Sequence, residues 1–589
     1  MEECTAKCPK ADHDPFLPTR LLDVDGIEQG EIKLVVTESL NDTSIQYAAL
    51  SYCWGNEEEA NRQLKTSDST IRQRLQGIPR DTLTKVMQDA VTVCRSLSLR
   101  YLWIDSLCII QDQKPHNASC ATDAGTDWEH QSQMMGDIFS NAYVTICAAN
   151  SSSCHESFLE RSLIRTDLDL AFVNENEQSD VNRTLTLVQC TPALANNESI
   201  DDRPLAMDLH GSRWLDRAWV FQERHMSPRM LIFGATMVHF RCGWLSMAEN
   251  GYHQQHVHPQ TLSGLLTNWS LDQPPHEDSK SKVKKTLALQ KEFRVLIREY
   301  RTTSLTYPSD RLPAISGLIS LVSKAVGDAS SQGLWKESLY YDLLWKTPPP
   351  SSLRFSHVLA QRSSLDNKNP SWSWLCEENQ NRGYFGVQRF KVNSLGLQPE
   401  YQESKILDSL DDDQYRPDTA INPIRRNILR IVARAKPLRS DDWGKTEYSH
   451  STIGELHTKR NGSSSYVAHC DFDFVFQEVH GGAELRDLCS DALLLCIASE
   501  RDKGNTLVSI PGHNEHRDFL QKPVTLGRDE GLPRESLRLL DHNAWGLIIY
   551  PVPQTDKYIR IGTFFALCYG NIKGARIFEG FEYRTYDIV

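Results

Sequence analysis

The sequence predicts an α/β N-terminal domain, a helical middle segment and a β-rich C-terminal domain. The first part is predicted by short apolar runs that alternate with amphipathic helical segments. The last part is predicted by a change of pattern after Pro348-Pro349-Pro350, where alternating apolar and polar residues become frequent. With 589 residues, the chain is long enough for about three or four domains with cores of their own.

In the first part, strands and helices are expected to follow one another in turn. A helix with apolar residues at helical spacing runs from Leu83 to Leu97, and a second helix begins near Thr126. Trp214–Glu223 is read as a helix or a tight turn. The expected strands are residues 32–36, 47–52, 101–105, 143–149, 231–233 and 238–242. This alternation is typical of a parallel sheet with helical crossovers.

The rest of the chain is expected to change from helices to strands. Helices are expected over residues 285–301, 310–326 and 334–345, and strands over residues 427–435, 469–476, 492–498, 546–552 and 558–565. The predicted organisation is a leader (residues 1–30), the α/β domain (31–250), a polar linker (251–282), a helical region (283–347) and a β-rich region (348–589).

The composition limits the classes of partner. The 77 acidic residues outnumber the 64 basic ones, giving a net charge of −13, which argues against a dedicated nucleic-acid binder but not against a local nucleotide site. The N-terminus has no apolar signal segment, and the most apolar stretches, residues 312–326 and 493–497, are too short to span a bilayer. We therefore expect a soluble, cytoplasmic protein.

Metal and cysteine chemistry is not expected. The 15 cysteines are scattered without a CxxC pair, which favours buried free thiols. His253, His256 and His258 have the spacing of metal ligands but lie in a polar linker without a cysteine partner. We predict no metal site and no required cofactor.

Three sequence boxes carry the functional signal. They are Ala49-Leu50-Ser51-Tyr52-Cys53-Trp54-Gly55, then Trp103-Ile104-Asp105-Ser106-Leu107-Cys108-Ile109-Ile110-Gln111, and then Trp214-Leu215-Asp216-Arg217-Ala218-Trp219-Val220-Phe221-Gln222-Glu223. In this order they resemble the ALSY-x-WG, WID-x-LCI-x-Q and W-x-x-R-x-W-x-x-QE boxes of the heterokaryon incompatibility (HET) domain of filamentous fungi. The resemblance places the core of such a domain at residues 47–224.

The resemblance implies a fold and a function. HET domains are regarded as distant relatives of TIR domains, which have a flavodoxin-like parallel sheet with flanking helices. Many TIR domains cleave NAD with a glutamate on a helix that follows a central strand, while others only assemble signalling complexes. Fungal family members trigger programmed cell death when unlike cells fuse, a form of allorecognition. On this basis Glu129 is the candidate catalytic residue and NAD+ the candidate substrate.

The residues themselves are compatible with such a site. Ligands of open parallel sheets bind at the carboxyl ends of the strands, and a carboxylate can stabilise the oxocarbenium ion that forms when an N-glycosidic bond breaks. The residues expected to bind the dinucleotide are Ser51, Tyr52, Trp54, Gly55, Asp105, Gln111 and Trp128.

Structural roles stay open for several of these residues. Thr126 and Glu129 have the spacing of a helix capping box. Asp105 can form a turn at the end of its strand, and Trp54 can belong to the core. Arg217 and Glu223 are read as a buried pair that fixes the third box.

Two kinds of function remain open for the whole chain. The first is a self/non-self recognition protein whose HET domain is a cell-death effector, either an NAD+ glycohydrolase or a non-enzymatic scaffold that acts by self-assembly. The second is an accessory protein of a metabolic gene cluster. Under the first hypothesis we expect a homo-oligomer formed through the HET domain and a protein partner for the C-terminal region.

Overall fold

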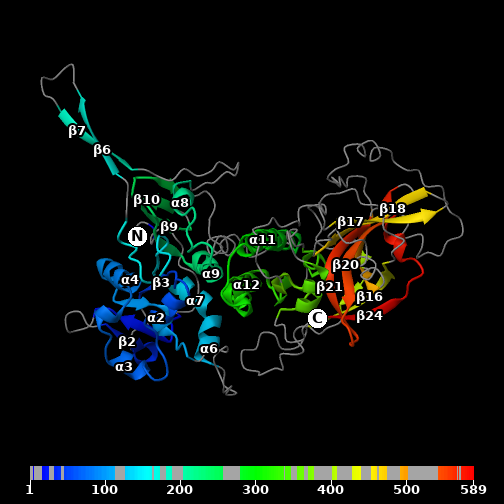
Figure 1. The fold of residues 1–589 in the computed structure, drawn as a ribbon, viewed down its shortest axis with the longest axis horizontal. Coiled ribbons are helices and arrows are strands. Elements are labelled where there is room, and N and C mark those ends of the chain that lie inside the picture. The colour runs from blue at the N-terminus through cyan, green and yellow to red at the C-terminus, as the bar shows by residue number, and fades with distance from the viewer. Residues whose placement is uncertain are drawn as a thin grey trace. The chain divides into compact units, whose positions relative to one another are not determined.

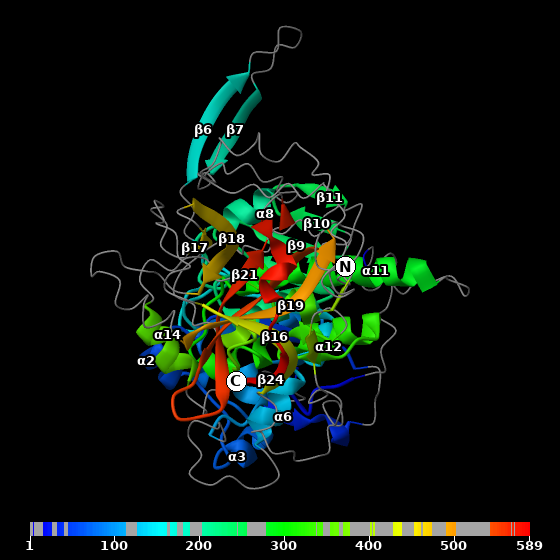
Figure 2. The same cartoon turned by 90° about the vertical axis from the view of Figure 1, so that its right-hand side faces the viewer.

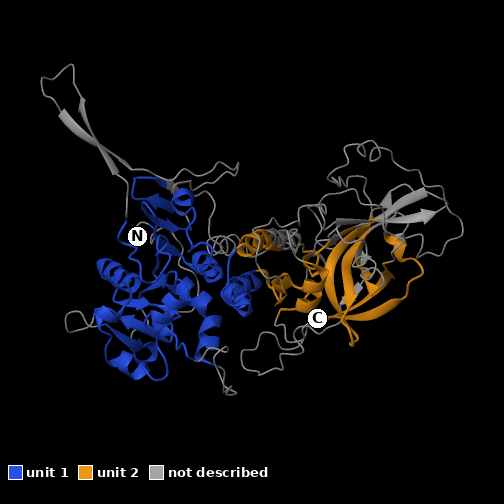
Figure 3. Ribbon diagram, viewed as in Figure 1, with its two compact units in different colours: residues 1–285, 303–325 blue, residues 286–302, 326–589 orange. Residues whose placement is uncertain are grey.

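The computed structural model divides into two compact units, residues 1–285 with 303–325 and residues 286–302 with 326–589 (Figure 3). Each unit is described below by itself. The structure describes residues 4, 16–25, 32–40, 45–112, 126–161, 165–172, 181–188, 203–243, 245–255, 279–336, 339–345, 354–363, 369–376, 401–402, 404–406, 428–438, 453–460, 463–473, 491–501, 542–566, 568–569 and 572–589.

The first unit is built around a mixed sheet. Its described strands are β1 (Arg20–Asp23), β2 (Lys33–Val36), β3 (Tyr47–Ser51), β4 (Tyr101–Trp103), β5 (Val144–Cys147), β8 (Arg229–Phe233), β9 (Val238–Cys242), β10 (Leu245–Ala248) and β11 (His253–Gln255). They pair in the order β11-β10-β9-β8-β5-β3-β4-β1-β2. The inner strands β4, β3, β5 and β8 are parallel, and the outer ones pair antiparallel. The predicted parallel sheet is thus confirmed, with antiparallel extensions at both sides.

Helices lie between the parallel strands along the chain, as expected from the alternating pattern, and one more helix follows the last strand of the sheet. The described ones are α2 (Glu57–Arg62), α3 (Ile71–Gln76), α4 (Lys85–Ser96), α5 (Asp105–Cys108), α6 (Asp127–Gln133), α7 (Met135–Asn141), α8 (Arg203–Asp208), α9 (Ala218–Met226) and α12 (Pro313–Val326), with short 3-10 turns at Thr37–Ser39, Arg80–Thr82 and Pro308–Asp310. Figure 1 shows α4 on one side of β3 and α7 on the other. Because α4 buries Val86, Met87, Ala90 and Cys94, its predicted apolar stripe is confirmed as the core face.

The sheet also takes up part of the segment predicted as a leader. Strand β1 lies within residues 1–30 and pairs antiparallel with β4 and β2, and all four of its residues are buried. A separate antiparallel hairpin is formed by β6 (Arg165–Phe172) and β7 (Val181–Val188).

The second unit contains a large β-structure. Its strands are β14 (Tyr401–Gln402), β15 (Ser404–Ile406), β16 (Leu429–Pro437), β17 (Ile453–Arg460), β18 (Ser463–Phe472), β19 (Leu493–Arg501), β20 (His542–Pro551), β21 (Lys557–Ala566), β22 (Cys568–Tyr569), β23 (Ile572–Lys573) and β24 (Tyr583–Ile588). Among the described strands, β16, β19, β20, β21 and β24 each pair with two others of the set, so they close into a ring. Figure 2 labels β16, β19, β21 and β24 of this ring. The strands confirm the predicted β-rich C-terminal region. The closed ring leaves these five strands without an exposed edge.

The helices of this unit include one correction. The described helices are α11 (Ser279–Tyr300, from residue 286 onward), α13 (Leu339–Asp342) and α14 (Phe355–Arg362), with 3-10 turns at Trp374–Cys376 and Gly574–Phe578. The helix predicted over residues 334–345 is confirmed only at α13 and is wrong at its start. Its first residues form strand β13 (Leu334–Trp335), which pairs with β12 (Ser330–Ser331) through a turn at Gln332 and Gly333, both with positive φ. Such a turn favours a hairpin over a continuing helix.

A buried ionic cluster lies in the core of the second unit. Asp473 Oδ2 accepts from Arg362 Nη1 at 2.6 Å and from Arg560 Nη1 at 3.1 Å. The guanidinium carbon of Arg560 lies 3.4 Å from the ring centre of Trp345, and Arg560 Nη2 donates to the Trp345 carbonyl. Ser371, from the segment before the 3-10 turn at Trp374–Cys376, accepts from the Arg560 amide at 2.9 Å. The cluster therefore connects segments of the second unit that lie far apart in the sequence.

Two sequence expectations concern the whole chain. In the described part, Cys94, Cys108, Cys147 and other cysteines are buried free thiols, as predicted. Within the same residues, every helix is too short or too polar to cross a membrane.

Candidate functional site

The first and second sequence boxes meet at the carboxyl ends of β3 and β4. Trp54, just after β3, donates from its indole Nε1 to Asp105 Oδ2 at 2.9 Å. Asp105 begins α5, and its Oδ1 accepts from the Ser106 amide at 2.7 Å. The Tyr52 hydroxyl bonds to Ser106 Oγ at 3.1 Å and to Gln63 Oε1 at 3.0 Å. Three of the predicted binding residues, Tyr52, Trp54 and Asp105, therefore lie together at one edge of the sheet.

The third box adds a buried carboxyl group. Glu223, on α9, accepts a hydrogen bond from the hydroxyl of Ser51 at the end of β3. The same hydroxyl oxygen accepts from Trp214 Nε1 at 2.7 Å. Ser51 and Trp214 are 1% and 0% exposed, and Glu223 is 8% exposed. A linear chain of hydrogen bonds thus runs from the indole of Trp214 through Ser51 to the Glu223 carboxylate.

The positive charge of Arg217 acts on the carboxyl groups of Glu223 and Asp105. Its Nη1 donates to the Tyr52 carbonyl, and its positive charge lowers the pKa of Glu223 and of Asp105. The predicted Arg217–Glu223 pairing is therefore electrostatic, while the hydrogen bonds of the two side chains go to residues of the first box. Arg217, which directly precedes α9, therefore links this helix to the first box through the Tyr52 carbonyl.

Burial has the largest effect on the pKa values of the Glu223 and Asp105 carboxyl groups. It raises the pKa of Glu223 to about 7, against the opposing effect of Arg217 and with a further increase from the negative charge of Asp105. It also raises the pKa of Asp105, opposed by Arg217 and by the hydrogen bonds to Ser106 and Trp54. A carboxyl group that titrates near neutral pH can both take up and release a proton, as a general acid or base must.

The edge of this cluster is partly exposed and carries a second cation. Lys65 Nζ lies 5.4 Å from the ring centre of Trp54, and burial lowers the pKa of Lys65. Gly55 follows with a φ of +94°, which favours glycine, and a Cβ there would lie 2.4 Å from Glu59 Oε2. Trp54, Gly55 and Lys65 thus give the edge an aromatic face, a close backbone turn and a positive charge.

Glu129 lies in a different polar environment. It sits on the first turn of α6, where its Oε2 accepts from the Thr126 amide at 2.9 Å and its own amide donates to Thr126 Oγ1 at 3.2 Å. The capping box is therefore formed. The contacts of Asp105 go to Trp54 and Ser106, so the structure does not bring Glu129 into that hydrogen-bonded cluster. The catalytic role of Glu129 stays a prediction.

The remaining two predicted binding residues have packing partners. Trp128 packs edge-on against Trp219, with ring centres 6.3 Å apart. Gln111 Nε2 donates to the carbonyls of Asp105 at 3.0 Å and Ile109 at 3.1 Å, and its Oε1 is buried without a hydrogen-bond partner in the described structure. Gln111, one of the predicted binding residues, therefore keeps a side-chain oxygen beside α5 that can still accept a hydrogen bond.

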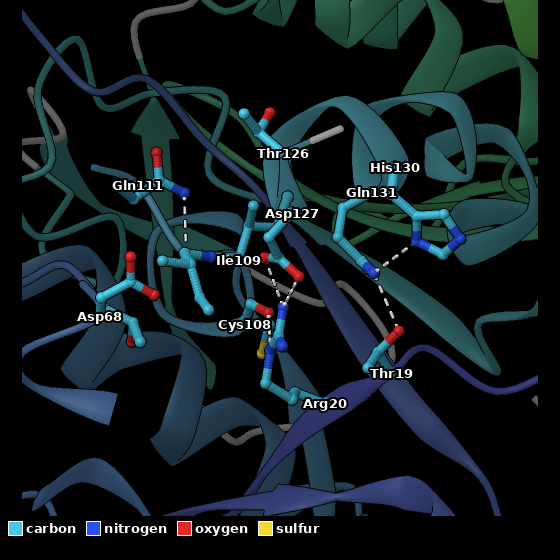
Figure 4. Close-up of polar contacts among 12 residues, drawn as sticks. Thr19, Arg20, Asp68, Cys108, Ile109, Gln111, Thr126, Asp127, His130 and Gln131 are labelled. Atoms are coloured by element: carbon cyan, nitrogen blue, oxygen red, sulfur yellow. Dashed lines mark hydrogen bonds and ion pairs between the residues drawn. The ribbon is translucent and has the colours of Figure 1, made fainter. Parts of the chain in front are cut away.

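An ion pair anchors α6 beneath the second box. Asp127 binds Arg20 Nη2 of β1 at 2.5 Å and 2.7 Å and accepts from the Ile110 amide at 2.8 Å, while Arg20 Nε donates to the Cys108 carbonyl at 2.7 Å (Figure 4). The Arg20 side chain is 8% exposed and the Asp127 side chain is 16% exposed. This contact connects the predicted leader to the loop that precedes Gln111.

Removing Asp127 is expected to destabilise the first unit. The variant Asp127→Ala leaves Arg20 nearly buried without its carboxylate, which costs about 3 kcal/mol. Urea unfolding of the full chain measures the change. The control Asp137→Ala removes an exposed carboxylate of the next helix and is expected to change stability by less than about 0.5 kcal/mol. Equal effects of the two variants would contradict the anchoring role.

In the described part of the chain, no group of histidine, cysteine and acidic residues is arranged to hold an ion, and the absence of a metal site stays a prediction. His253 lies in β11, whereas His256 and His258 lie outside the described residues.

The comparison with known families agrees with the three boxes. Residues 47–223 match the family model described as Heterokaryon incompatibility protein (HET). This match supports a HET domain in this part of the chain, and the region is called the HET domain below. No curated protein and no solved structure matches the chain. The match supports a heterokaryon incompatibility-type function, and all the hydrogen-bonded residues from Ser51 to Glu223 lie inside the matched region.

Sequence reasoning did not assign a role in the HET site to several of these residues. The sequence predicts a structural pair of Arg217 and Glu223 and gives no separate role to Trp214 or Lys65, because their contacts join residues far apart in the chain. The available signal was the QE pair at the end of the third box, since a charged residue beside an apolar helix stripe is rarely buried without a partner.

Proposed function

We propose that this chain is a heterokaryon incompatibility protein whose HET domain is a cell-death effector, and that it cleaves the N-glycosidic bond of a dinucleotide such as NAD+ beside Glu223. The observation that carries the proposal is the buried carboxyl of Glu223, which is hydrogen-bonded to Ser51 at the carboxyl end of β3 and has a pKa of about 7. Ser51 of the first box and Trp214 of the third box belong to its hydrogen-bond chain, and the charge of Asp105 from the second box acts on it.

The topology of the sheet supports this location. The four parallel strands lie in the order β4-β3-β5-β8, so the chain crosses from β3 to β4 in one direction and from β5 to β8 in the other. Between β3 and β5 the connections diverge, and such a switch point is where ligands bind in open α/β sheets. The same strand order is found in flavodoxin-like sheets, which is consistent with the proposed relation to TIR domains.

The residues fit the needs of the reaction. In NAD+ hydrolysis the bond between ribose C1′ and the nicotinamide nitrogen breaks, nicotinamide leaves with the bonding electrons, and water adds to C1′. A carboxylate stabilises the positive charge that develops on the ribose, and Glu223 can accept the proton that the water releases. The cations Lys65 and Arg217 suit a pyrophosphate, and Trp54 offers a ring face for stacking.

The test is nicotinamide release by the purified full-length chain together with growth arrest when it is expressed in a fungal host. Glu223→Gln is expected to lower nicotinamide release on the order of 100-fold or more, because the amide cannot carry the charge or accept the proton. Growth arrest is expected to disappear with it. Glu129→Gln serves as the comparison, since glutamine also completes a capping box.

The outcomes separate the hypotheses. Loss of release in Glu129→Gln but not in Glu223→Gln would overturn the assignment to Glu223 and favour the residue predicted from the family resemblance. Growth arrest that persists in both variants, with no nicotinamide release by the wild type, would contradict the enzymatic proposal and favour the scaffold that acts by self-assembly.

A further inference from the structure

Helix α12 packs against the HET domain although it lies about 90 residues beyond the family match. Residues 303–325 belong to the first compact unit. The contact is made at two glycines, Gly136 on α7 and Gly317 on α12. A Cβ at Gly136 would lie 2.9 Å from Gly317 Cα, and one at Gly317 would lie 2.8 Å from Gly136 Cα. The two backbones can approach this closely only because both residues lack side chains.

At the same point α12 binds the helix that carries Glu223. The Gly317 amide donates to Gln222 Oε1 at 2.7 Å, and Gln222 is 1% exposed. Gln222 and Glu223 are neighbours on α9, so their side chains leave the helix about 100° apart. One is bound to α12 and the other to β3, and together they fix the rotation of α9 about its axis.

The segment before α12 fixes the beginning of the same helix. The Ala218 amide, at the first turn of α9, donates to the Ser304 carbonyl at 3.0 Å, and the Ser304 amide donates to the Asp216 carbonyl at 2.5 Å. The first amides of a helix lack partners within the helix, so this carbonyl takes the place of a cap. Residues 303–325 therefore bind α9 at its start and at its middle.

We propose that Gln222 is a positioning residue that holds Glu223 against Ser51, and that residues 303–325 are a working part of the HET site, contributed from outside the family region. The inference rests on the proposed function for its catalytic consequence only. Gln222 does not touch the proposed substrate. It acts by keeping α9 in the orientation in which the Trp214–Ser51–Glu223 chain of hydrogen bonds forms.

The experiment uses the full chain labelled with 5-fluorotryptophan. The Trp214 fluorine resonance is identified by its loss in Trp214→Phe. Since Trp214 donates to Ser51 and Ser51 donates to Glu223, this resonance follows the titration of the carboxyl, which also senses Arg217 and Asp105. Nicotinamide release is measured on the same samples.

Gln222→Met keeps the size of the side chain but removes the acceptor for Gly317, and Gly317→Ala separates α12 from α7. Both are expected to shift the midpoint of the Trp214 titration by about half a pH unit or more and to lower nicotinamide release about tenfold or more. The matched control is Gly77→Ala, because a Cβ at Gly77 meets no atom within 4 Å. It is expected to behave as the wild type.

The results distinguish this inference from the proposed function. Wild-type midpoints in Gln222→Met and in folded Gly317→Ala would overturn the inference, and if Gly317→Ala does not fold, Gln222→Met decides alone. A shifted midpoint without nicotinamide release by any variant, the wild type included, would support the positioning role and overturn the proposed reaction.

Discussion

The Glu223→Gln variant is expected to be more stable than the wild type at pH 8, by up to about 3 kcal/mol, and equally stable near pH 4. The folded protein raises the pKa of Glu223 from 4.5 to about 7, mainly by burial. The stability that the protonated carboxyl contributes is complete below pH 4.5 and is lost as the pH rises through 7. Glutamine is neutral throughout, so it does not suffer this loss.

The measurement is the free energy of unfolding in urea, taken for both proteins at several pH values between 4 and 8. The charged groups that act on Glu223 are Arg217 and Asp105, and both are unchanged in the variant. The control Glu129→Gln keeps its capping acceptor and is expected to stay within about 0.5 kcal/mol of the wild type at every pH. A difference between Glu223→Gln and the wild type that does not grow with pH would contradict the buried-carboxyl interpretation.

A stabilising substitution at this position has a functional meaning. Substitutions that stabilise a protein while abolishing its activity occur where a functional group is held in an unfavourable environment. If Glu223→Gln both raises stability at pH 8 and abolishes nicotinamide release, the cost of burying the carboxyl is explained by its role and not by the fold.

The second large effect is expected in the second unit. Asp473→Ala leaves the guanidinium groups of Arg362 and Arg560, 5% and 0% exposed as residues, without the carboxylate that both of them bind. Breaking a buried ion pair from one side costs about 3–5 kcal/mol. We expect the second unit to unfold at a lower urea concentration by the corresponding amount, followed by tryptophan fluorescence, since Trp345 stacks on Arg560.

The control for this prediction is an ion pair of the same chemistry on the surface of the same unit. Asp587 binds Arg430 through two contacts of 2.7 Å, and the arginine side chain is 51% exposed. Asp587→Ala is expected to cost at most about 1 kcal/mol. An effect of Asp473→Ala no larger than that of Asp587→Ala would show that the buried cluster does not hold the second unit together.

Much of the fold could be predicted from local patterns. The strands at residues 47–51, 101–103 and 144–147 are mostly apolar and almost entirely buried, as expected for strands covered on both faces. The apolar stripe of α4 likewise predicts its core face. Where local signals are weak, prediction failed or was incomplete. The apolar residues of 334–345 suggested a helix, but the backbone at Gln332 and Gly333 turns the chain into a hairpin. The spacing of apolar residues does not indicate a turn of this kind, because it depends on the backbone angles of two residues that precede the apolar run.

The candidate site could be located but not assembled from the sequence. The three boxes identified Ser51, Asp105 and Trp54, and the structure places them at one sheet edge. The role of Glu223 depends on Ser51, 172 positions away, and that of Gln222 on Gly317, 95 positions away. The capping box of Glu129 was visible because it is local, whereas the burial that raises the pKa of Glu223 arises only when distant segments pack.

The position of β24 in the second unit has a consequence for synthesis on the ribosome. This strand, which ends at Ile588, lies between β16 and β21 and completes the ring of strands. All segments of the first unit, up to residue 325, are translated before it. At about 5–20 residues per second, roughly 15 to 50 s separate the emergence of the last part of the first unit from that of β24. The first unit can therefore fold while the nascent second unit is still incomplete, and any property that needs the complete ring of strands arises only after this interval.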